Sequence, residues 1–188
     1  MLYAIRYDLQ MSDSQSEVIY ETLRRYNSAA QYVLDIAVKR KLRNHVTLSN
    51  LMVPDPDGSK GAEVKLSKRV QTKFNLQSGL VDTAIRHVGA ELRRAEEQDD
   101  EPSFDFNVFI NYSQNTASVG TVKMMHPAVR DLHMKLSLTM ATSRFQFRFN
   151  RSEPEAFDDP QFKANDLVLM VGDASDEHVF WAFFEVAE

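Results

Sequence analysis

The sequence contains no cysteine. This absence excludes disulfide bonds, zinc sites built on thiolates and cysteine nucleophiles. Residues 1–10 also lack the basic and then apolar pattern of a signal peptide. No apolar run approaches the roughly 20 residues that a membrane helix needs. We therefore predict a protein of the cytoplasm that makes no contact with a membrane.

The common catalytic signatures are absent as well. There is no G-x-S-x-G nucleophile motif, no P-loop and no G-x-G-x-x-G turn. A metal site needs clustered ligands with supporting hydrogen bonds, whereas the histidines are scattered along the chain. These observations predict a binding module without a catalytic centre, a metal site or a cofactor. The histidines are His45, His87, His126, His133 and His178.

The charge is unevenly divided between the two halves of the chain. The net charge over all 188 residues is −5. Residues 1–94 carry 15 Lys and Arg against 10 Asp and Glu, whereas residues 95–188 carry 7 against 17. Such a contrast suggests that the first half meets an anionic partner. The alternative is a chance distribution of solvated surface charges.

Hydrophobic periodicity predicts one strand followed by helices. Residues 3–9 alternate between apolar and polar side chains, as in a half-buried strand. Ser14 and Glu17 have the spacing of a capping box, and apolar residues then recur every three or four positions to about Lys41. Two further helices are predicted over 64–74 and from Ser78 onward. The acidic stretch 96–102 is typical of a solvated linker.

The chain turns to strands after residue 103. Alternation over 104–112, 134–140 and 144–150 predicts strands, and 166–171 with 179–186 predicts a final hairpin. A weaker strand is predicted near 115–124. We expect the first strand to join this later sheet. The predicted fold class is therefore α+β: a small antiparallel, wedge- or OB-like β-barrel with an insertion of about three helices. Its parts are the first barrel strand (1–10), the helical recognition-type insertion (11–98) and the remainder of the barrel (99–188).

Three segments together resemble a known family. Residues 22–37 (TLRRYNSAAQYVLDIA) and 73–92 (KFNLQSGLVDTAIRHVGAEL) resemble helices of TnpB proteins, the transposon-encoded RNA-guided nucleases related to type V CRISPR effectors. The run 164–169, followed by an aromatic strand, is similar to the end of their wedge barrel. The resemblance implies the same order of an N-terminal strand, a helical recognition insert and a barrel.

The nuclease part of that family has no counterpart in this sequence. TnpB proteins continue into a RuvC-type domain with an acidic triad and usually a zinc ribbon. A two-metal nuclease needs carboxylates that hold two ions roughly 4 Å apart, and no acidic set here follows that pattern. The family's catalysis is therefore not carried over. The resemblance implies a nuclease-deficient relative of the recognition half.

Basic residues of the helices and of one strand are the candidate contacts to nucleic acid. In the second predicted helix, Lys65, Lys68, Arg69 and Lys73 recur at steps of three and four residues and predict one basic stripe. Such a surface suits phosphates. The resemblance places duplex-reading residues near the start of the third helix. The full set of candidates is Arg6, Arg24, Arg25, Tyr26, Asn27, Lys65, Lys68, Arg69, Lys73, Asn75, Gln77, Ser78, Arg86, Arg144, Arg148 and Arg151.

Several of these residues also have a purely structural explanation. Basic residues near helix C-termini are favourable for the helix itself. Ser78 suits a simple N-cap. Phe145, Phe147 and Phe149 could stack on bases, but three phenylalanines at period two are more often core residues.

The sequence therefore predicts a non-catalytic module that binds guide-type RNA, with target DNA as a further candidate ligand. It would act as a regulator, or as a subunit beside a separate chain that supplies the nuclease. In RNA-guided effectors the protein reads backbone shape while base pairing reads sequence. The alternative is a protein–protein interaction module, an inhibitor or adaptor of a related effector, that binds no nucleic acid itself.

Overall fold

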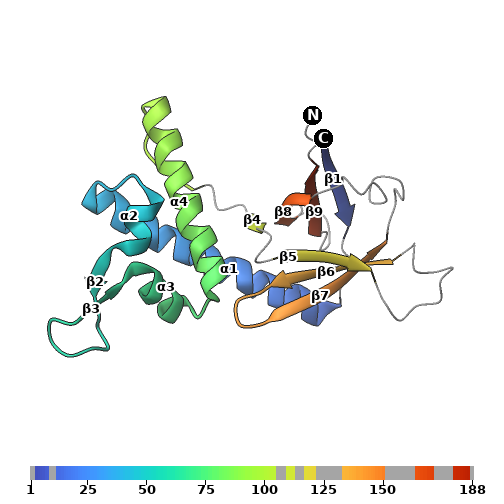
Figure 1. Cartoon of the computed structure of the whole chain (residues 1–188), viewed down its shortest axis with the longest axis horizontal. Helices are drawn as coiled ribbons and strands as arrows, with labels where there is room; N and C mark the ends of the chain where they lie inside the picture. The colour runs from blue at the N-terminus through green and yellow to red at the C-terminus, as the bar shows by residue number, and fades with distance from the viewer. Residues whose placement is uncertain are drawn as a thin grey trace. The chain divides into compact units, whose positions relative to one another are not determined.

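The fold is organised as two compact units (Figure 1). A computed structural model describes residues 3–8, 12–104, 109–112, 117–121, 133–150, 164–171 and 180–186. The helical unit comprises Tyr20–Phe106 and Met140–Thr142. The strand unit comprises Met1–Ile19, Asn107–Thr139 and Ser143–Glu188.

The helical unit is built from four helices and one short hairpin. The long helix α1 (Asp13–Arg40) begins in the strand unit and ends in the helical unit. It is followed by α2 (His45–Asn50), the paired strands β2 (Met52–Pro54) and β3 (Glu63–Lys65), α3 (Leu66–Phe74) and α4 (Ser78–Gln98). The predicted helices over 14–41, over 64–74 and from Ser78 are confirmed. The sequence patterns missed α2 and the β2–β3 hairpin.

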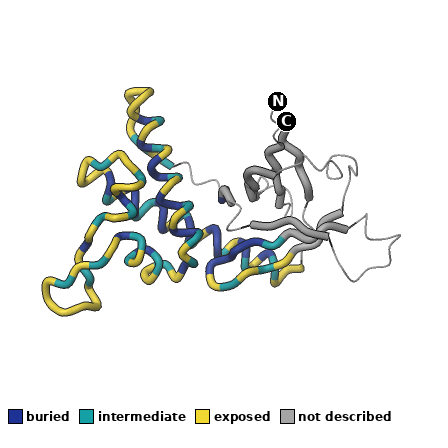
Figure 2. The backbone as a smooth tube through the Cα atoms, in the orientation of Figure 1, coloured by how far each residue is buried: buried dark blue, intermediate teal, exposed yellow. Residues whose placement is uncertain are grey.

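The core of the helical unit follows the predicted helix spacing. Figure 2 shows buried segments on all four helices and exposed backbone at the end of α4. Removing one such aliphatic side chain from water contributes about 1.5–3 kcal/mol, so this inner face stabilises the unit. Fully or almost fully buried side chains include Tyr26, Val33, Ala37, Leu48, Leu66, Val70, Leu80, Ile85 and Val88.

The N-cap of helix α1 lies two residues before the predicted one. The amide of Gln15 donates to Ser12 Oγ at 3.4 Å, and the amide of Ser12 donates to Gln15 Oε1 at 3.0 Å. This reciprocal pair is a capping box with Ser12 as the N-cap. The prediction of a capping box at Ser14 and Glu17 is wrong. Both pairs are separated by three residues, so the spacing alone could not distinguish them.

Three helices end on a residue in the left-handed region. Lys41 after α1, Asn75 after α3 and Asp99 after α4 have φ of 56°, 49° and 51°. In α1 the amide of Leu42 then donates to the Ala37 carbonyl at 2.9 Å, which is the bond of a Schellman motif. Asn and Asp tolerate this conformation better than other side chains, so Lys41 is the strained member of the three.

Glycine allows a close approach between α2 and α4. A Cβ atom built on Gly89 of α4 would lie 2.7 Å from Cβ of His45, the first residue of α2. That distance is too short for two carbon atoms in contact. Only glycine therefore fits at this position of α4.

Among the described residues, the strand unit forms two antiparallel sheets. In one, the order is β1-β9-β8-β4, and in the other β5-β6-β7. The strands are β1 (Tyr3–Asp8), β4 (Phe109–Tyr112), β5 (Ala117–Thr121), β6 (His133–Thr139), β7 (Arg144–Asn150), β8 (Ala164–Val171) and β9 (Phe180–Val186).

Most of the strand predictions are confirmed, including two pairings. The first strand joins the later sheet, because β1 pairs with β9 from Tyr3 opposite Val186 to Asp8 opposite Trp181. The last two strands pair with each other as the predicted hairpin. In the region predicted as the strand 104–112, the described strand is confined to β4, and residues 105–108 lie outside the described residues.

The predicted small antiparallel β-barrel, closed or nearly closed, with an insertion of about three helices is wrong. Within the described residues the strands form separate open sheets, with β1 and β4 at the edges of one and β5 and β7 at the edges of another. The densely described stretch 12–104 is mostly helical, with helices of 28, 6, 9 and 21 residues. Alternation identified the strands but carries no information on whether a sheet closes.

Candidate nucleic-acid interface

The two predicted arginines of α1 share one carboxylate. Arg24 donates to both oxygens of Glu21, each at 2.8 Å, and Arg25 Nε donates to Glu21 Oε1 at 2.6 Å. Hydrogen bonds from Arg24 and then from Arg25 lower the pKa of the Glu21 carboxyl to about 2. Glu21 therefore stays ionised at neutral pH and offsets part of the positive charge that the sequence suggested for this turn.

Arg25 also connects α1 to the turn between α3 and α4. Its Nη1 donates to the carbonyl oxygen of Asn75 at 3.2 Å, and its side chain is 25% exposed. Asn75 is the left-handed C-cap of α3. Arg25 and Asn75 therefore both have a structural role within the helical unit.

Tyr26 lies in the core. Its side chain is buried, and its hydroxyl lies 3.4 Å from His87 Nδ1. Burial raises the pKa of Tyr26, and His87 in turn meets the ring of Phe104 with centroids 5.0 Å apart. The ring of Tyr26 is therefore not accessible for stacking on a base. Its neighbour Asn27 is half-buried.

Two lysines at the start of α3 face solvent. Leu66 and Val70 of this helix are buried. At 3.6 residues per turn, Lys68 lies on the opposite side of the helix, and Lys65 is the N-cap residue that precedes the helix. Both are exposed, and neither forms an ion pair with any residue that the structure describes. Both are therefore predicted contacts that are exposed and have no carboxylate partner among the described residues.

The remaining two residues of the predicted stripe have partners. Arg69 is 18% exposed, and its Nη1 lies 3.5 Å from Asp57 Oδ2 in the β2–β3 loop. Lys73 places its Nζ 4.9 Å from the centroid of the Tyr32 ring on α1. A cation over an aromatic face is stabilised by roughly 0.5–1 kcal/mol at exposed sites. The stripe therefore divides into an outer pair, Lys65 and Lys68, and two residues held against neighbouring elements.

The start of α4 presents polar residues of different kinds. Gln77 is the N-cap, and its side chain makes no capping hydrogen bond. Its own amide donates to the carbonyl of Ala141 at 3.0 Å. Ser78 is the exposed first residue of the helix. The interpretation of Ser78 as the N-cap is wrong, because Gln77 occupies that position.

The arginines along α4 are paired within the helix. Arg86 Nη2 lies 2.9 Å from Asp82 Oδ2. Arg94 donates to both oxygens of Glu91, at 2.8 and 2.7 Å. The hydrogen bond from Arg94 lowers the pKa of Glu91, and the amide of Ser103 adds to that effect. Glu91 thereby fixes the segment that follows α4 onto the helix.

The candidates from the strands belong to the other unit. Arg144 is exposed on β7 and donates to Ser137 Oγ at 2.9 Å. Arg6 lies on β1 and Arg148 on β7. Arg151 lies outside the described residues. Phe145 is half-buried on β7 opposite Leu138.

The carboxylates that hold the arginines were missed from the sequence. Glu21, Asp82 and Glu91 each precede their arginine by three or four residues, the spacing that brings side chains together on one helix face. This signal was present in the sequence. It separates arginines with an intrahelical partner from lysines without one.

The described residues hold no group of three or more His, Asp or Glu placed so as to bind a metal ion. Within the same part of the chain, none of the helices combines the length and apolarity that crossing a membrane requires.

Comparison with known proteins leaves the chain without an assigned family. No protein-family model matches it, and no curated protein matches it either.

Proposed function

We propose that the chain is a non-catalytic nucleic-acid-binding module whose main electrostatic contact is made by Lys65 and Lys68 on the outer side of α3. The ligand is guide-type RNA, and the RNA–DNA heteroduplex with target DNA is a further ligand of the same surface. The module acts as a regulator or beside a separate chain that carries a nuclease.

One observation supports this proposal most directly: Lys65 and Lys68 are exposed and without carboxylate partners among the described residues. A phosphate that binds such a lysine displaces only water and counterions, and counterion release favours binding. By contrast, a phosphate that binds Arg24 or Arg86 must compete with Glu21 or Asp82. The lysines are therefore the stronger phosphate contacts.

The proposed mode of recognition is sequence-independent. Lysine is a point charge on a flexible stem, which suits phosphate contacts rather than base reading. The candidate aromatic residue of α1, Tyr26, is buried. Recognition of backbone shape is the part that protein plays in RNA-guided complexes, where base pairing reads the sequence.

The experiment compares two double variants that each remove two positive charges. We expect Lys65→Gln/Lys68→Gln to weaken binding of a fluorescein-labelled RNA–DNA heteroduplex of about 20 base pairs and of its RNA strand alone. Each lysine that contacts a phosphate contributes roughly one unit to the slope of log affinity against log salt. The slope should fall by roughly two units in this variant.

The matched control is Arg24→Gln/Arg86→Gln, which removes the same charge from residues paired with Glu21 and Asp82. This variant should bind the probes almost as the parent does. Equal losses in both variants would show only a dependence on net charge. Absence of binding by the parent protein, together with purification free of RNA, would refute the proposed function.

A second candidate function is supported by the ion pairs themselves. Because several arginines are partnered and the net charge is −5, the chain also suits a protein–protein interaction module that binds no nucleic acid. Such a module would purify without RNA and would show no salt-dependent binding of the labelled probes.

A further inference from the structure

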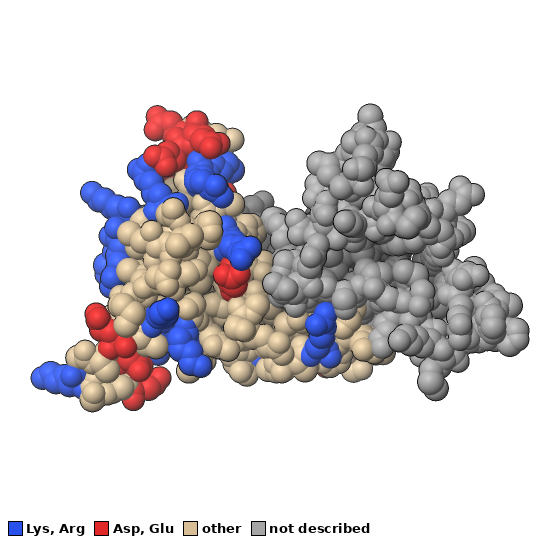
Figure 3. Space-filling model, in the orientation of Figure 1, with Lys and Arg blue, Asp and Glu red and all other residues tan. Residues whose placement is uncertain are grey.

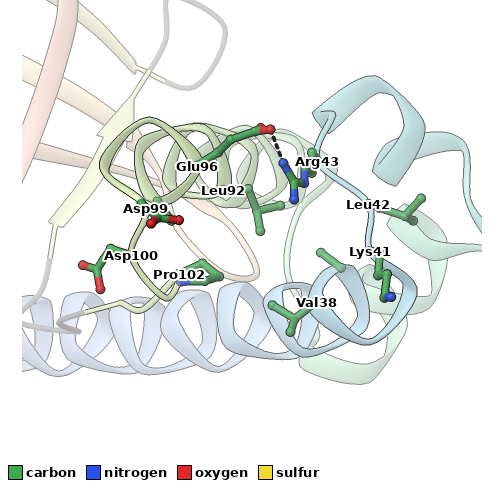
Figure 4. A pocket seen from close by; sticks show the side chains of 11 residues that line it. Val38, Lys41, Leu42, Arg43, Leu92, Glu96, Asp99, Asp100 and Pro102 are labelled. Carbon is green, nitrogen blue, oxygen red and sulfur yellow. Dashed lines mark hydrogen bonds and ion pairs between the residues drawn. The ribbon is translucent and has the colours of Figure 1, made fainter.

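A groove opens beside the C-terminal ends of α1 and α4. It lies within the helical unit, and its volume is about 480 Å³. That volume is within the range of roughly 300–1,000 Å³ typical of ligand pockets. The lining residues come from the last turn of α1, the segment after it, the last turns of α4 and the turn that follows (Figure 4).

The middle of the groove is apolar. Val38 from α1 and Leu92 from α4 point into it, with Pro102 beside them (Figure 4). Val38 is 50% exposed, and it is one of four large apolar side chains that stand out on the described surface. An exposed apolar side chain within a concavity gains most when another apolar group covers it.

One end of the groove is acidic. Asp99 and Asp100 line it, and they belong to a run that also contains Glu96, Glu97 and Glu101, without a Lys or Arg between them. Figure 3 shows these acidic side chains gathered at the end of α4. Among the described residues, Glu97, Asp99 and Glu101 form no ion pair, whereas Asp100 Oδ2 lies 3.8 Å from Arg94 Nη1. The C-terminus of a helix also carries partial negative charge, so this end favours a cation.

The opposite end of the groove is positively charged. Lys41 lies there, away from Asp99 and Asp100 (Figure 4). Between the ends, Arg43 and Glu96 form an ion pair across the rim. Because that pair neutralises itself, the unbalanced charges are at the two ends. This separation of charge would orient a charged ligand along the groove.

We propose that this groove binds a peptide segment of a partner protein, in which an apolar side chain covers Val38 and Leu92 and neighbouring Lys or Arg side chains reach Asp99 and Asp100. Charge complementarity selects a basic segment over an acidic one at this end. The site is separate from the lysines of α3 and does not depend on the proposed nucleic-acid binding.

The test uses a phage-displayed library of random peptides selected on the full chain. We expect enrichment of peptides with a large apolar residue flanked by Lys or Arg. An enriched peptide, synthesised with a fluorescent label, is then titrated against variants. Val38→Arg should weaken it by at least about tenfold, because it places a charge against the apolar anchor. Asp99→Asn/Asp100→Asn should weaken it roughly two- to tenfold.

The control for the first variant is Val46→Arg. Val46 is 55% exposed on α2 and does not line the groove, so this change should leave the peptide's affinity unaltered. Asparagine is chosen at position 99 because it tolerates the left-handed backbone there.

Three outcomes would overturn the proposal. The first is a selection that enriches no peptide or only acidic ones. The second is an enriched peptide that binds Val38→Arg as tightly as the parent. The third is a concentration-dependent dimer that Val38→Arg abolishes, because a second copy of the chain would then occupy the groove.

Discussion

The arginines of α1 and α4 and the outer lysines of α3 belong to one compact unit, yet their surroundings differ. Arg24, Arg25 and Arg86 lie three or four residues from a carboxylate on their own helix. Lys65 and Lys68 have no such partner among the described residues. A count of positive residues therefore overstates the surface available to an anionic polymer. In the framework formed by α1, α2 and α4, these arginines are paired with carboxylates, whereas Lys65 and Lys68 beside α3 face solvent.

The largest expected effect comes from Gly89→Ala, which forces α2 and α4 apart. Its Cβ would lie 2.7 Å from Cβ of His45, and overpacking of this kind costs about 1–3 kcal/mol of unfolding free energy. Urea denaturation measures the loss. Because the change leaves Lys65 and Lys68 in place, the salt slope of RNA binding by the folded protein should not change. Ala90→Gly, at an exposed neighbouring position, serves as a control that lowers helix propensity without a steric clash.

Lys41→Gly should stabilise the C-terminal end of α1. Lys41 ends α1 with φ of 56°, where glycine carries no steric penalty. We expect the unfolding free energy to rise by about 1 kcal/mol, since the left-handed conformation costs roughly 1–2 kcal/mol for most side chains. Asn75→Gly should stabilise the protein less, because asparagine already tolerates this region. An equal gain in both variants would contradict the idea that Lys41 is the more strained.

Glu21→Gln should make the framework arginines behave more like the lysines of α3. Removing the shared carboxylate charge leaves Arg24 and Arg25 without their counter-charge. If they then reach phosphates, the salt slope of RNA binding should steepen by roughly one to two units. Fluorescence polarisation at several salt concentrations measures the change. Glu17→Gln, an exposed acid one turn earlier on α1, is the matched control.

The smallest expected effect is a pH dependence of the contact between α1 and α4. Burial lowers the pKa of His87, and the charge of Glu91 opposes that shift. The unfolded chain therefore binds the proton more readily than the folded one, so stability should fall as the pH drops below about 6.5, the ordinary histidine value. Thermal unfolding of the parent and of His87→Gln across pH 5 to 8 measures this contribution. An equal pH dependence in both proteins would contradict it.

Local patterns predicted the elements better than their arrangement. Helix spacing located α1, α3 and α4, and alternation located β7 at Arg144–Asn150. The short helix α2 was missed because six residues contain too few turns to show a period. Closure of the sheet depends on contacts between distant strands, which alternation does not encode. For the same reason a barrel was predicted where the described strands form open sheets.

The sequence predicted which residue types form the candidate site, but not whether each side chain is exposed to solvent. Lys65 and Lys68 were identified as basic and are exposed. Tyr26 was included among the nucleic-acid contacts, although its position with Leu23, Ala30 and Val33 on the apolar stripe pointed to the core, where it is buried. The groove beside Val38 could not be found from the sequence, because the residues that form it come from separate helices.

The pairing of β1 with β9 has a consequence for how the chain is made. Tyr3 faces Val186 across this ladder, so β1 cannot pair with its neighbour until β9, far along the chain, has been synthesised. Closing so long a loop is slow compared with forming local turns. The helices, whose contacts are closer in sequence, can assemble during that interval. We therefore expect β1 to dock after the helices have formed, and a nascent chain to expose β1 until β9 has been synthesised.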